Sequence, residues 1–262
     1  MKKRAICLLS LVPCRSEPND RSEMVSQLLF GDLVEIKAQK DSWSKILIID
    51  DNYQAWVDSK QLHPLESKEF EKLLKARVCF LEELLVPLIN TTTNEIQTVL
   101  LGSKIRGIKA KSSSFSIDKV NYVLEGKCRA TVKIIKRKQL IEDAFTYINT
   151  PYLWGGKSPM GIDCSGFVQM VYAMNGLRLP RDASQQVELG HALSFIEEAE
   201  DGDLAFFANA EGKIIHVGIM LSNNRIIHAS GKVRIDRIDH QGIFREDLND
   251  YSHKLRIIKK II

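Results

Sequence analysis

The stretch Asp163-Cys164-Ser165-Gly166-Phe167-Val168 begins a segment with the pattern of an amphipathic helix. The apolar residues that mark one face of this helix are Phe167, Val168, Val171 and Tyr172. Asn175-Gly176 is typical of a helix end. Asp163 suits the N-cap position, so we expect Cys164 in the first turn of the helix.

A cysteine in a first helical turn lies at the positive end of the helix dipole, beside backbone N–H groups that have no partner in the helix. Such a site lowers a thiol pKa from ~8.5 to roughly 3.5–7.5, especially next to a histidine. The same N–H groups can hold the oxyanion of a tetrahedral intermediate. Cys164 is therefore a candidate nucleophile, and the alternative is an inert, buried cysteine at a helix start.

Two histidines follow in a predicted β-hairpin. The segments His216–Leu221 and Arg225–Ala229 flank Ser222-Asn223-Asn224, a composition typical of a tight turn. A register centred on residues 222–223 places His216 opposite His228 on the same face, with Cβ atoms ~5 Å apart. One imidazole can then take the thiol proton while the other orients it. We expect His216 as the base and His228 as the orienting residue, although either histidine alone fits a polar core position equally well.

The elements around this hairpin predict an α+β layout, with helices followed by an antiparallel sheet. Asp182, with Gln185 three residues later, suits a capping box at the start of the third helix. Helices are expected over residues 141–148, 164–175 and 184–189, and strands over residues 204–208, 216–221, 225–229 and 254–258.

Residues 138–262 resemble the NlpC-type cell-wall cysteine peptidases, which have a papain-like α+β fold. The matching motifs are Pro151-Tyr152-Leu153-Trp154-Gly155-Gly156, Asp163-Cys164-Ser165-Gly166-Phe167, Leu179-Pro180-Arg181, Gly202-Asp203-Leu204-Ala205-Phe206-Phe207, His216-Val217-Gly218-Ile219 and Ile227-His228-Ala229. The resemblance implies a Cys164–His216–His228 triad that hydrolyses the bond between γ-D-glutamate and a diamino acid. It also implies that Tyr152 lies near the oxyanion site. We expect no cofactor and no metal ion.

The front of the chain reads as two small β modules, residues 1–62 and 78–136, joined by a charged connector with a short helix over residues 63–77. The first module resembles the SH3-like domain of the dipeptidyl-peptidase branch of this family in its segments 15–18, 21–31 and 53–57. The second module resembles a further SH3-like domain. The expected fold is thus two small SH3-like β-barrel domains before a papain-like peptidase domain over residues 137–262.

In that branch the SH3-like domain caps the cleft and restricts it to peptides with a free N-terminal L-alanine, so that L-Ala-γ-D-Glu is released. The resemblance implies that Glu23, Tyr53 and Asp182 bind the α-ammonium group, which acidic and phenolic groups suit. It further implies a substrate site lined by Trp154, Asp163, Ser165 and Ala183. The alternative for Glu23 is a solvated charge, for Tyr53 a core residue, and for Asp182 a helix cap alone.

The composition is that of a soluble globular protein, with 44% apolar and 27% charged residues among 262. The 37 Lys and Arg residues only slightly exceed the 33 Asp and Glu residues and are dispersed, which disfavours nucleic acid as a partner. Five cysteines without CxxC spacing argue against a disulfide framework and a structural zinc site. We expect a monomer that acts on murein-derived peptides.

The N-terminus allows two interpretations. Met1-Lys2-Lys3-Arg4 and the apolar residues 5–12, with Cys14 beyond them, are similar to an export signal. Pro13 before this cysteine, and an apolar stretch far shorter than the ~20 residues of a membrane span, favour a buried strand and no transmembrane segment. We therefore expect a cytoplasmic protein; a periplasmic or outer-membrane-associated location is the alternative.

Three other functions stay open from the sequence. The same triad would serve a thiol acyltransferase or an amidase. A non-catalytic cell-wall-binding protein would use the SH3-like modules alone. Cys164, His216 and His228 are also residue types that bind zinc.

Overall fold

The structure is a computed structural model that describes residues 3–131 and 134–262. The chain forms two compact units, one of residues 1–131 with 155–159 and one of residues 132–154 with 160–262. Met1 and Lys2 of the basic N-terminal stretch lie outside the described residues. So do Val132 and Lys133 of the second predicted β module.

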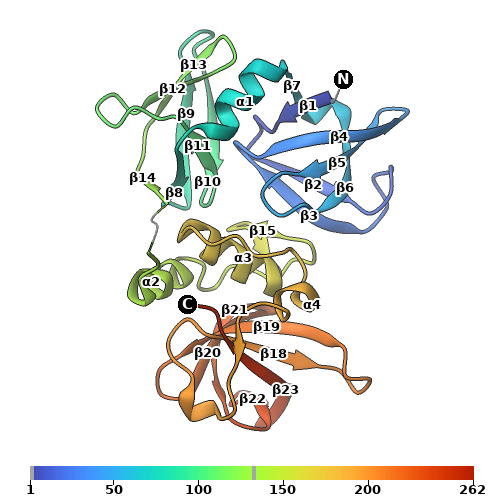
Figure 1. The fold of residues 1–262 in the computed structure, drawn as a ribbon, viewed down its shortest axis with the longest axis vertical. Coiled ribbons are helices and arrows are strands. Elements are labelled where there is room, and N and C mark those ends of the chain that lie inside the picture. The colour runs from blue at the N-terminus through green and yellow to red at the C-terminus, as the bar shows by residue number, and fades with distance from the viewer. Residues whose placement is uncertain (1–2, 132–133) are drawn as a thin grey trace. The chain divides into compact units, whose positions relative to one another are not determined.

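The first unit begins with an antiparallel sheet whose strand order is β3-β2-β6-β5-β4-β1-β7 (Figure 1). Polar turns separate its strands, and Asp41 and Asn52 take positive φ in two of these turns. The elements are β1 (Lys3–Ile6), β2 (Leu11–Arg15), β3 (Met24–Leu29), β4 (Leu33–Lys40), β5 (Trp43–Ile48), β6 (Gln54–Asp58), the short 3-10 helix η1 (Ser59–Gln61) and β7 (His63–Leu65).

Two smaller sheets complete this unit, with strand orders β10-β9-β13-β12 and β11-β8-β14. The predicted connector contains β7 as well as a helix. The elements are α1 (Ser67–Lys75), β8 (Val78–Leu81), β9 (Leu85–Asn90), β10 (Glu95–Leu100), β11 (Lys104–Arg106), β12 (Ser114–Ile117), β13 (Val120–Leu124), β14 (Cys128–Ala130) and β15 (Lys157–Ser158).

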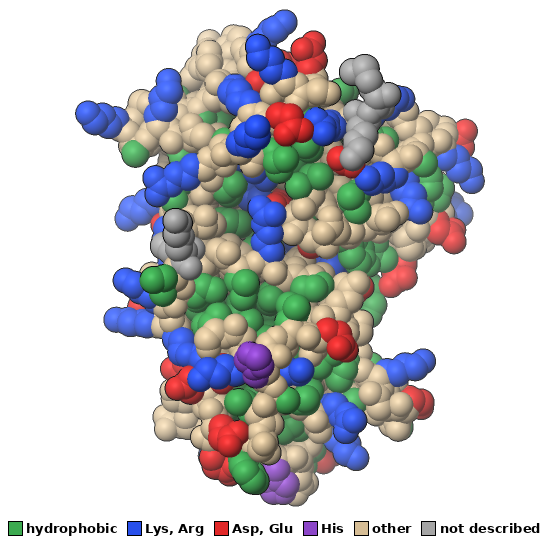
Figure 2. Space-filling view, in the orientation of Figure 1, with side chains coloured by type: hydrophobic (Ala, Val, Ile, Leu, Met, Phe, Trp, Pro, Cys, Tyr) green, Lys and Arg blue, Asp and Glu red, His purple; other side chains and the backbone are tan. Residues whose placement is uncertain are grey.

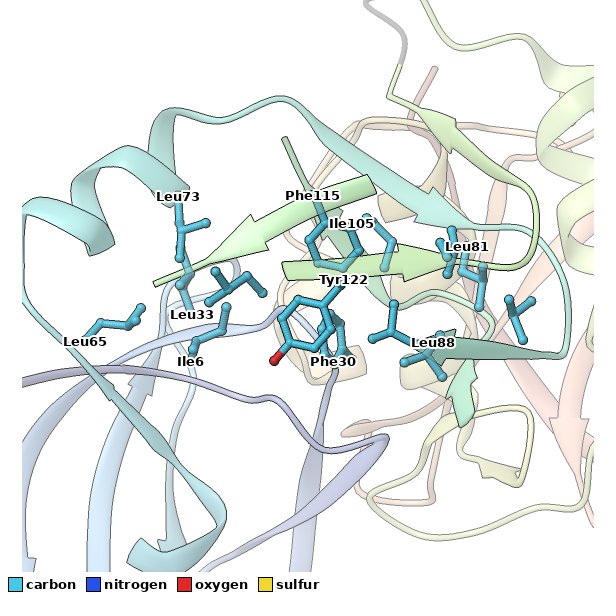
Figure 3. Close-up of a cluster of buried hydrophobic side chains, with 14 of the residues drawn as sticks. Ile6, Phe30, Leu33, Leu65, Leu73, Leu81, Leu88, Ile105, Phe115 and Tyr122 are labelled. Carbon is cyan, nitrogen blue, oxygen red and sulfur yellow. The ribbon is translucent and has the colours of Figure 1, made fainter. Parts of the chain in front are cut away.

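The two β modules of the first unit share a core. Figure 3 shows Ile6 and Leu33 from the first sheet, and Phe30 from the turn between β3 and β4, beside side chains from α1 and the second module. The Phe30 ring meets the rings of Phe115 and Tyr122 edge-on, at centroid distances of 6.2 and 6.0 Å. Burial of this apolar surface therefore stabilises both modules together.

A buried ion cluster also connects the two modules. The Lys104 ammonium group donates to Asp32 and to Asp50, the latter at 2.6 Å. Burial lowers the pKa of Lys104, but the two carboxylates outweigh burial and raise it above its ordinary value. Lys104 thus stays charged, and it compensates two carboxylates that would be costly to bury alone.

Lys104→Met should therefore lower the free energy of unfolding of the first unit by about 3–5 kcal/mol, because it leaves a buried carboxylate without its cation. Urea denaturation of both proteins measures this difference. Lys37→Met is the matched control, since Lys37 pairs with Glu35 at the surface and should cost less than about 1 kcal/mol. Equal midpoints for the two variants would contradict a stabilising role for the cluster.

The N-terminal stretch forms strands, as the second of its two interpretations predicted. β1 pairs with β4 and with β7, and β2 pairs with β3. Ala5, Ile6, Cys7 and Val12 are completely buried. Residues 3–6 and 11–15 are therefore part of the first sheet and its core.

The second unit combines three helices with a ring of antiparallel strands. β18 to β23 each pair with the next strand, and β23 also pairs with β18, so the ring closes. α3 packs on β19 and β20, and α4 packs on β19 (Figure 1). The elements are α2 (Arg137–Thr146), β16 (Gly161–Ile162), α3 (Cys164–Met174), α4 (Ala183–Gln186), β17 (His191–Ala192), the 3-10 helix η2 (Ile196–Glu198), β18 (Leu204–Ala208), β19 (Ile214–Leu221), β20 (Arg225–Ser230), β21 (Lys232–Ile238), β22 (Gly242–Arg245) and β23 (Asp250–Lys260).

Most elements of this unit were predicted, with shifts at their ends. α2 ends at Thr146, five residues before Pro151, and α4 is shorter than the helix expected over residues 184–189. Asp182 and Gln185 form the predicted capping box at the start of α4. β21 and β22 were not predicted, because the charged residues among Lys232–Arg237 are also typical of a solvated loop.

On the face in Figure 2, Lys and Arg side chains lie scattered among Asp, Glu and uncharged residues. No helix within residues 3–131 and 134–262 is both long and apolar enough to cross a bilayer.

Candidate active site

The predicted nucleophile lies at the first position of α3, as the sequence indicated. The carboxylate of Asp163 caps this helix and accepts the N–H of Gly166 at 2.7 Å. Arg181 donates to both oxygens of Asp163 and, at 3.0 Å, to the hydroxyl of Ser165. A buried arginine–carboxylate pair thus holds the start of the helix in place.

The thiol of Cys164 contacts the strand that carries the first histidine. The backbone N–H of Val217, the residue after His216, hydrogen-bonds the sulfur, as does the N–H of Ser165. The residue is only 6% exposed. Burial and the charge of Asp163 raise the pKa of the thiol to about 12, and the N–H groups and Arg181 only partly oppose them.

This direction is opposite to the prediction of a lowered thiol pKa. Loss of hydration in the folded interior outweighs the helix end and the two N–H groups. Burial also lowers the pKa of His216 well below its ordinary value, and His228 and His253 lower it further. The thiol and the imidazole are therefore both neutral in this structure at neutral pH.

The two histidines are joined by a hydrogen bond of 2.8 Å between Nε2 of His216 and Nδ1 of His228. Both rings are buried, and they lie on the same face of the sheet as predicted. The observed register is centred on residue 223, at one end of the predicted range, so His228 lies opposite Gly218 and the expected direct pairing with His216 is wrong. The histidines are diagonal neighbours, and their side chains bridge the longer separation of that geometry.

Gly218 leaves the space that this diagonal contact needs. A Cβ atom on Gly218 would lie 2.9 Å from Cβ of His228 and 2.7 Å from Cδ1 of Ile226. The first atom is fixed to the backbone of β20, so the conflict would move His228 itself. Any side chain at position 218 therefore disturbs the histidine pair.

Two further residues of the site were missed by sequence reasoning. Asp236 on β21 accepts from Nε2 of His228 at 2.9 Å, and the ring of His253 on β23 stacks on His216 with centroids 4.1 Å apart. The Ser230-Gly231 turn, followed by alternation of apolar and charged residues, is a signal that could have located β21. Nothing local in the sequence marks His253.

Of the residues that the family resemblance singled out, Tyr152 and Ser165 lie near the thiol, and Asp182 and Ala183 lie at the start of α4. Burial and the neighbouring Cys164 and Asp163 raise the pKa of Tyr152, so its phenol stays a neutral hydrogen-bond donor. Ser165 follows the cysteine in α3. Ala183 opens α4, and Asp182 caps it.

The remaining predicted residues are divided between the two units. Trp154 is 61% exposed in the second unit. Glu23 is an exposed residue just before β3, and Tyr53 packs against the core of the first sheet. In the part of the chain that the structure describes, no group of three or more His, Cys, Asp or Glu side chains could hold a metal ion.

Residues 149–250 match the NlpC/P60 family, and residues 14–62 match the bacterial dipeptidyl-peptidase SH3 domain. This chain is an NlpC/P60 peptidase with an N-terminal bacterial SH3 domain. The match confirms the predicted family. It also confirms the α+β fold class, with a β-rich SH3-like region before the NlpC/P60 domain.

Known proteins similar to this NlpC/P60 peptidase extend over most of its length. A gamma-D-glutamyl-L-lysine dipeptidyl-peptidase of Bacillus subtilis is 27% identical over 220 residues, which cover 78% of this chain and 71% of that protein. One from Bacillus cereus is 24% identical and covers 79% and 68%. The crystal structure of an NlpC/P60 family protein from Bacillus cereus has a TM-score of 0.80 at 19% identity, covering 98% and 99%.

Gly218→Ala should lower peptidase activity about 100-fold, because a displacement of about 1 Å at a catalytic group has that effect. Steady-state kinetics measures the loss, and thermal unfolding checks the fold. In Gly218→Ala/Ile226→Ala both contacts with the side chain of residue 226, at 2.7 and 2.8 Å, are removed and the contact with His228 stays, so activity should remain low. Wild-type activity in the single variant would show that the pair tolerates the displacement.

The neutral state of the thiol predicts how Cys164 reacts with iodoacetamide. Because its pKa is raised to about 12, the thiolate fraction should grow about tenfold per pH unit from pH 6 to pH 9. The rate of alkylation, followed by mass spectrometry of the peptide that contains Cys164, should rise in parallel. Cys164→Ala gives the background from the other cysteines. A rate that is flat between pH 5 and 7 would instead indicate a thiolate–imidazolium pair.

Proposed function

We propose that this NlpC/P60 peptidase cleaves the bond between γ-D-glutamate and the diamino acid in peptidoglycan-derived peptides that have a free N-terminal L-alanine, and so releases L-Ala-γ-D-Glu. The observation that supports it most is the Cys164 thiol in contact with the strand of a hydrogen-bonded His216–His228 pair. The similarity to two dipeptidyl-peptidases over most of the chain supports this substrate class.

In the proposed mechanism, Cys164 is the nucleophile and His216 the base. As the sulfur attacks the carbonyl carbon, Nδ1 of His216 takes the thiol proton, because its Nε2 is engaged by His228. The proton then passes to the leaving amine, and a thioester to the γ-carboxyl of D-glutamate remains. Water, deprotonated by His216, hydrolyses this thioester and restores the thiol.

The developing oxyanion needs donors close to the sulfur. The backbone N–H of Cys164, at the first position of α3, is suited to this role, because the N–H groups of Ser165 and Gly166 already donate to the sulfur and to Asp163. The neutral phenol of Tyr152, near Cys164, is a second donor. We assign Tyr152 to this role.

The requirement for a free amine follows from the proposed dipeptide release. A polar pocket for an ammonium group loses its partner when the substrate carries an acylated nitrogen, and a buried unpaired carboxylate is costly. Asp182, beside Ala183 at the start of α4, is the proposed carboxylate in the second unit. Glu23 and Tyr53 are proposed to contribute as the family resemblance implies.

The decisive experiment uses L-Ala-γ-D-Glu-L-Lys and its N-acetylated form. We expect L-Ala-γ-D-Glu, identified by mass spectrometry, from the free peptide and at least about 100-fold less from the acetylated one. Cys164→Ala should release none, whereas Cys128→Ala, a free cysteine in β14 of the first unit, should match the wild type. Equal cleavage of both peptides would refute the selectivity, and full activity of Cys164→Ala would refute the nucleophile.

The same assay separates hydrolysis from acyl transfer. With hydroxylamine present, a transferase would form mainly the hydroxamate of the dipeptide, whereas the proposed peptidase forms mainly the free acid. A protein that only binds cell wall would produce neither.

We further propose that the enzyme acts in the cytoplasm. All five cysteines are free thiols, which fits a reducing compartment. Fractionation of cells that produce the full chain tests this location, and recovery of the protein with the periplasmic marker would contradict it.

A further inference from the structure

The chain of hydrogen bonds behind the thiol extends beyond the histidine pair. Nε2 of His216 meets Nδ1 of His228, and Nε2 of His228 meets Oδ2 of Asp236 at 2.9 Å. These three residues stand on three neighbouring strands, β19, β20 and β21. Asp236 is only 8% exposed, and its position on the sheet face of His228 follows from the register in which His228 pairs with Arg234.

The last acceptor of this hydrogen-bonded chain, Asp236, determines which nitrogen of each histidine carries the hydrogen. An ionised carboxylate can only accept, so Nε2 of a neutral His228 must carry the hydrogen. Its Nδ1 then has a lone pair and accepts from Nε2–H of His216. Nδ1 of His216 is left without a hydrogen, which is the state that a base for the thiol requires.

Arg234 keeps Asp236 in this acceptor state. Its Nη2 donates to Oδ1 of Asp236 at 2.7 Å, and its Nε lies 2.7 Å from Oδ2. Burial raises the pKa of Asp236, but the hydrogen bonds from His228 and Arg234 outweigh it and hold the pKa below its usual value. The carboxylate is therefore ionised at neutral pH.

We propose that Asp236 is a positioning residue that fixes the tautomers of His228 and His216, and so directs the unprotonated Nδ1 of His216 to the thiol. The inference rests on the proposed role of His216 as the base. Asp236 does not touch the reacting atoms and acts through His228.

The charge of Asp236 also acts on the imidazolium that forms when His216 takes the thiol proton. The titratable and charged groups that face the histidine pair are His253 from β23, Arg234 and Asp236 from β21, and Arg245 from β22, while Cys164 from α3 contacts the backbone of β19 at Val217, next to His216. Asp236 is the acceptor within the hydrogen-bonded chain, whereas Arg234 and Arg245 oppose a positive charge on His228. Without this carboxylate, charging the buried pair becomes less favourable.

Asp236→Asn tests this inference while keeping the shape of the side chain. Arg234 donates to Asp236 through Nη2 and Oδ1, and its Nε has no hydrogen-bond partner among the described residues, so the amide oxygen of the variant takes the place of Oδ1 and the amide NH₂ faces Nε2 of His228. That reverses both tautomers and places a hydrogen on Nδ1 of His216. Loss of general-base catalysis should lower kcat by about 10²–10⁴-fold, with KM changed less than threefold.

Asp247→Asn is the matched control. Asp247 also accepts from Arg234, at 3.1 Å, and pairs with Arg245, so both of these partners are arginines and not histidines. This variant perturbs the same arginine and should keep kcat within threefold. Loss of activity equal to that of Asp236→Asn would assign the effect to Arg234 and overturn the inference.

Chemical rescue gives a readout that a structural role would not show. Asp236 lines a cleft of about 640 Å³ together with Arg234. In Asp236→Ala, formate can enter this cleft, bind Arg234 and accept from His228. We expect formate to raise kcat at least tenfold, and chloride at the same ionic strength to have no effect; equal responses to the two anions would count against the inference.

Nitrogen-15 NMR of the histidines separates this inference from the proposed function. In the wild type, both His216 and His228 should carry hydrogen on Nε2, and Asp236→Asn should move both hydrogens to Nδ1. A wild-type His228 with hydrogen on Nδ1 overturns the inference without any variant. If the wild type shows the expected tautomers but releases no dipeptide, the proposed function fails and the positioning role of Asp236 stands.

Discussion

The hydrogen bond between Nε2 of His216 and Nδ1 of His228 determines which atom of the first ring can face the thiol. Each imidazole has two nitrogens, and this 2.8 Å contact occupies one on each ring, so the direction of both rings is set. The contact depends on sheet register: a shift of one residue would turn His228 to the opposite face. Closure of the ring from β18 to β23 keeps the register, since every one of these strands is paired on both sides.

Burial then decides how charge can move in the site. It raises the pKa of Cys164 and lowers that of His216, so the resting pair holds no charge. A proton that moves to His216 creates two buried charges, and each needs a partner already in place. The N–H groups of Val217 and Ser165 donate hydrogen bonds to the sulfur, and Asp236 stabilises the imidazolium of His216 through its hydrogen bond with His228. Proton transfer is therefore favourable only together with attack on a substrate that takes up the negative charge.

The parts of the site that could be predicted from the sequence have local signals. The N-cap at Asp163, the apolar face after Cys164 and the capping box at Asp182 are all set by residues within a few positions of one another. The hairpin was predictable for the same reason. Its exact pairing was not, because it depends on the backbone of the turn: Asn223 and Asn224 both take positive φ, and the loop Ser222–Asn224 then pairs Leu221 with Arg225.

The parts that could not be predicted depend on contacts between distant strands. In the sequence, Asp236 is one of several charged residues in a polar segment. Only the folded sheet brings its carboxylate within hydrogen-bond distance of His228. The thiol pKa was predicted in the wrong direction because the helix end is visible in the sequence, whereas the burial that opposes it is not. The shared core of the two β modules also depends on packing, since the residue pattern of neither module predicts the contact between Phe30 and Tyr122.

The proposed nucleophile and the proposed base are each held in place by a carboxylate–arginine pair. Arg181 binds Asp163, which orients the helix start at Cys164, and Arg234 binds Asp236, which orients His228. In both pairs the carboxylate accepts from the arginine and also from a further group, the N–H of Gly166 or Nε2 of His228, and this fixes how that group is oriented. Buried pairs of this kind are weak evidence for stability, because desolvation offsets most of their attraction. The role of these pairs is geometric. The sulfur of Cys164 and the ring of His216, which is proposed to deprotonate it, belong to different elements, α3 and β19. The Arg181–Asp163 pair fixes the position of the helix start, and the Arg234–Asp236 pair fixes the tautomer of His228.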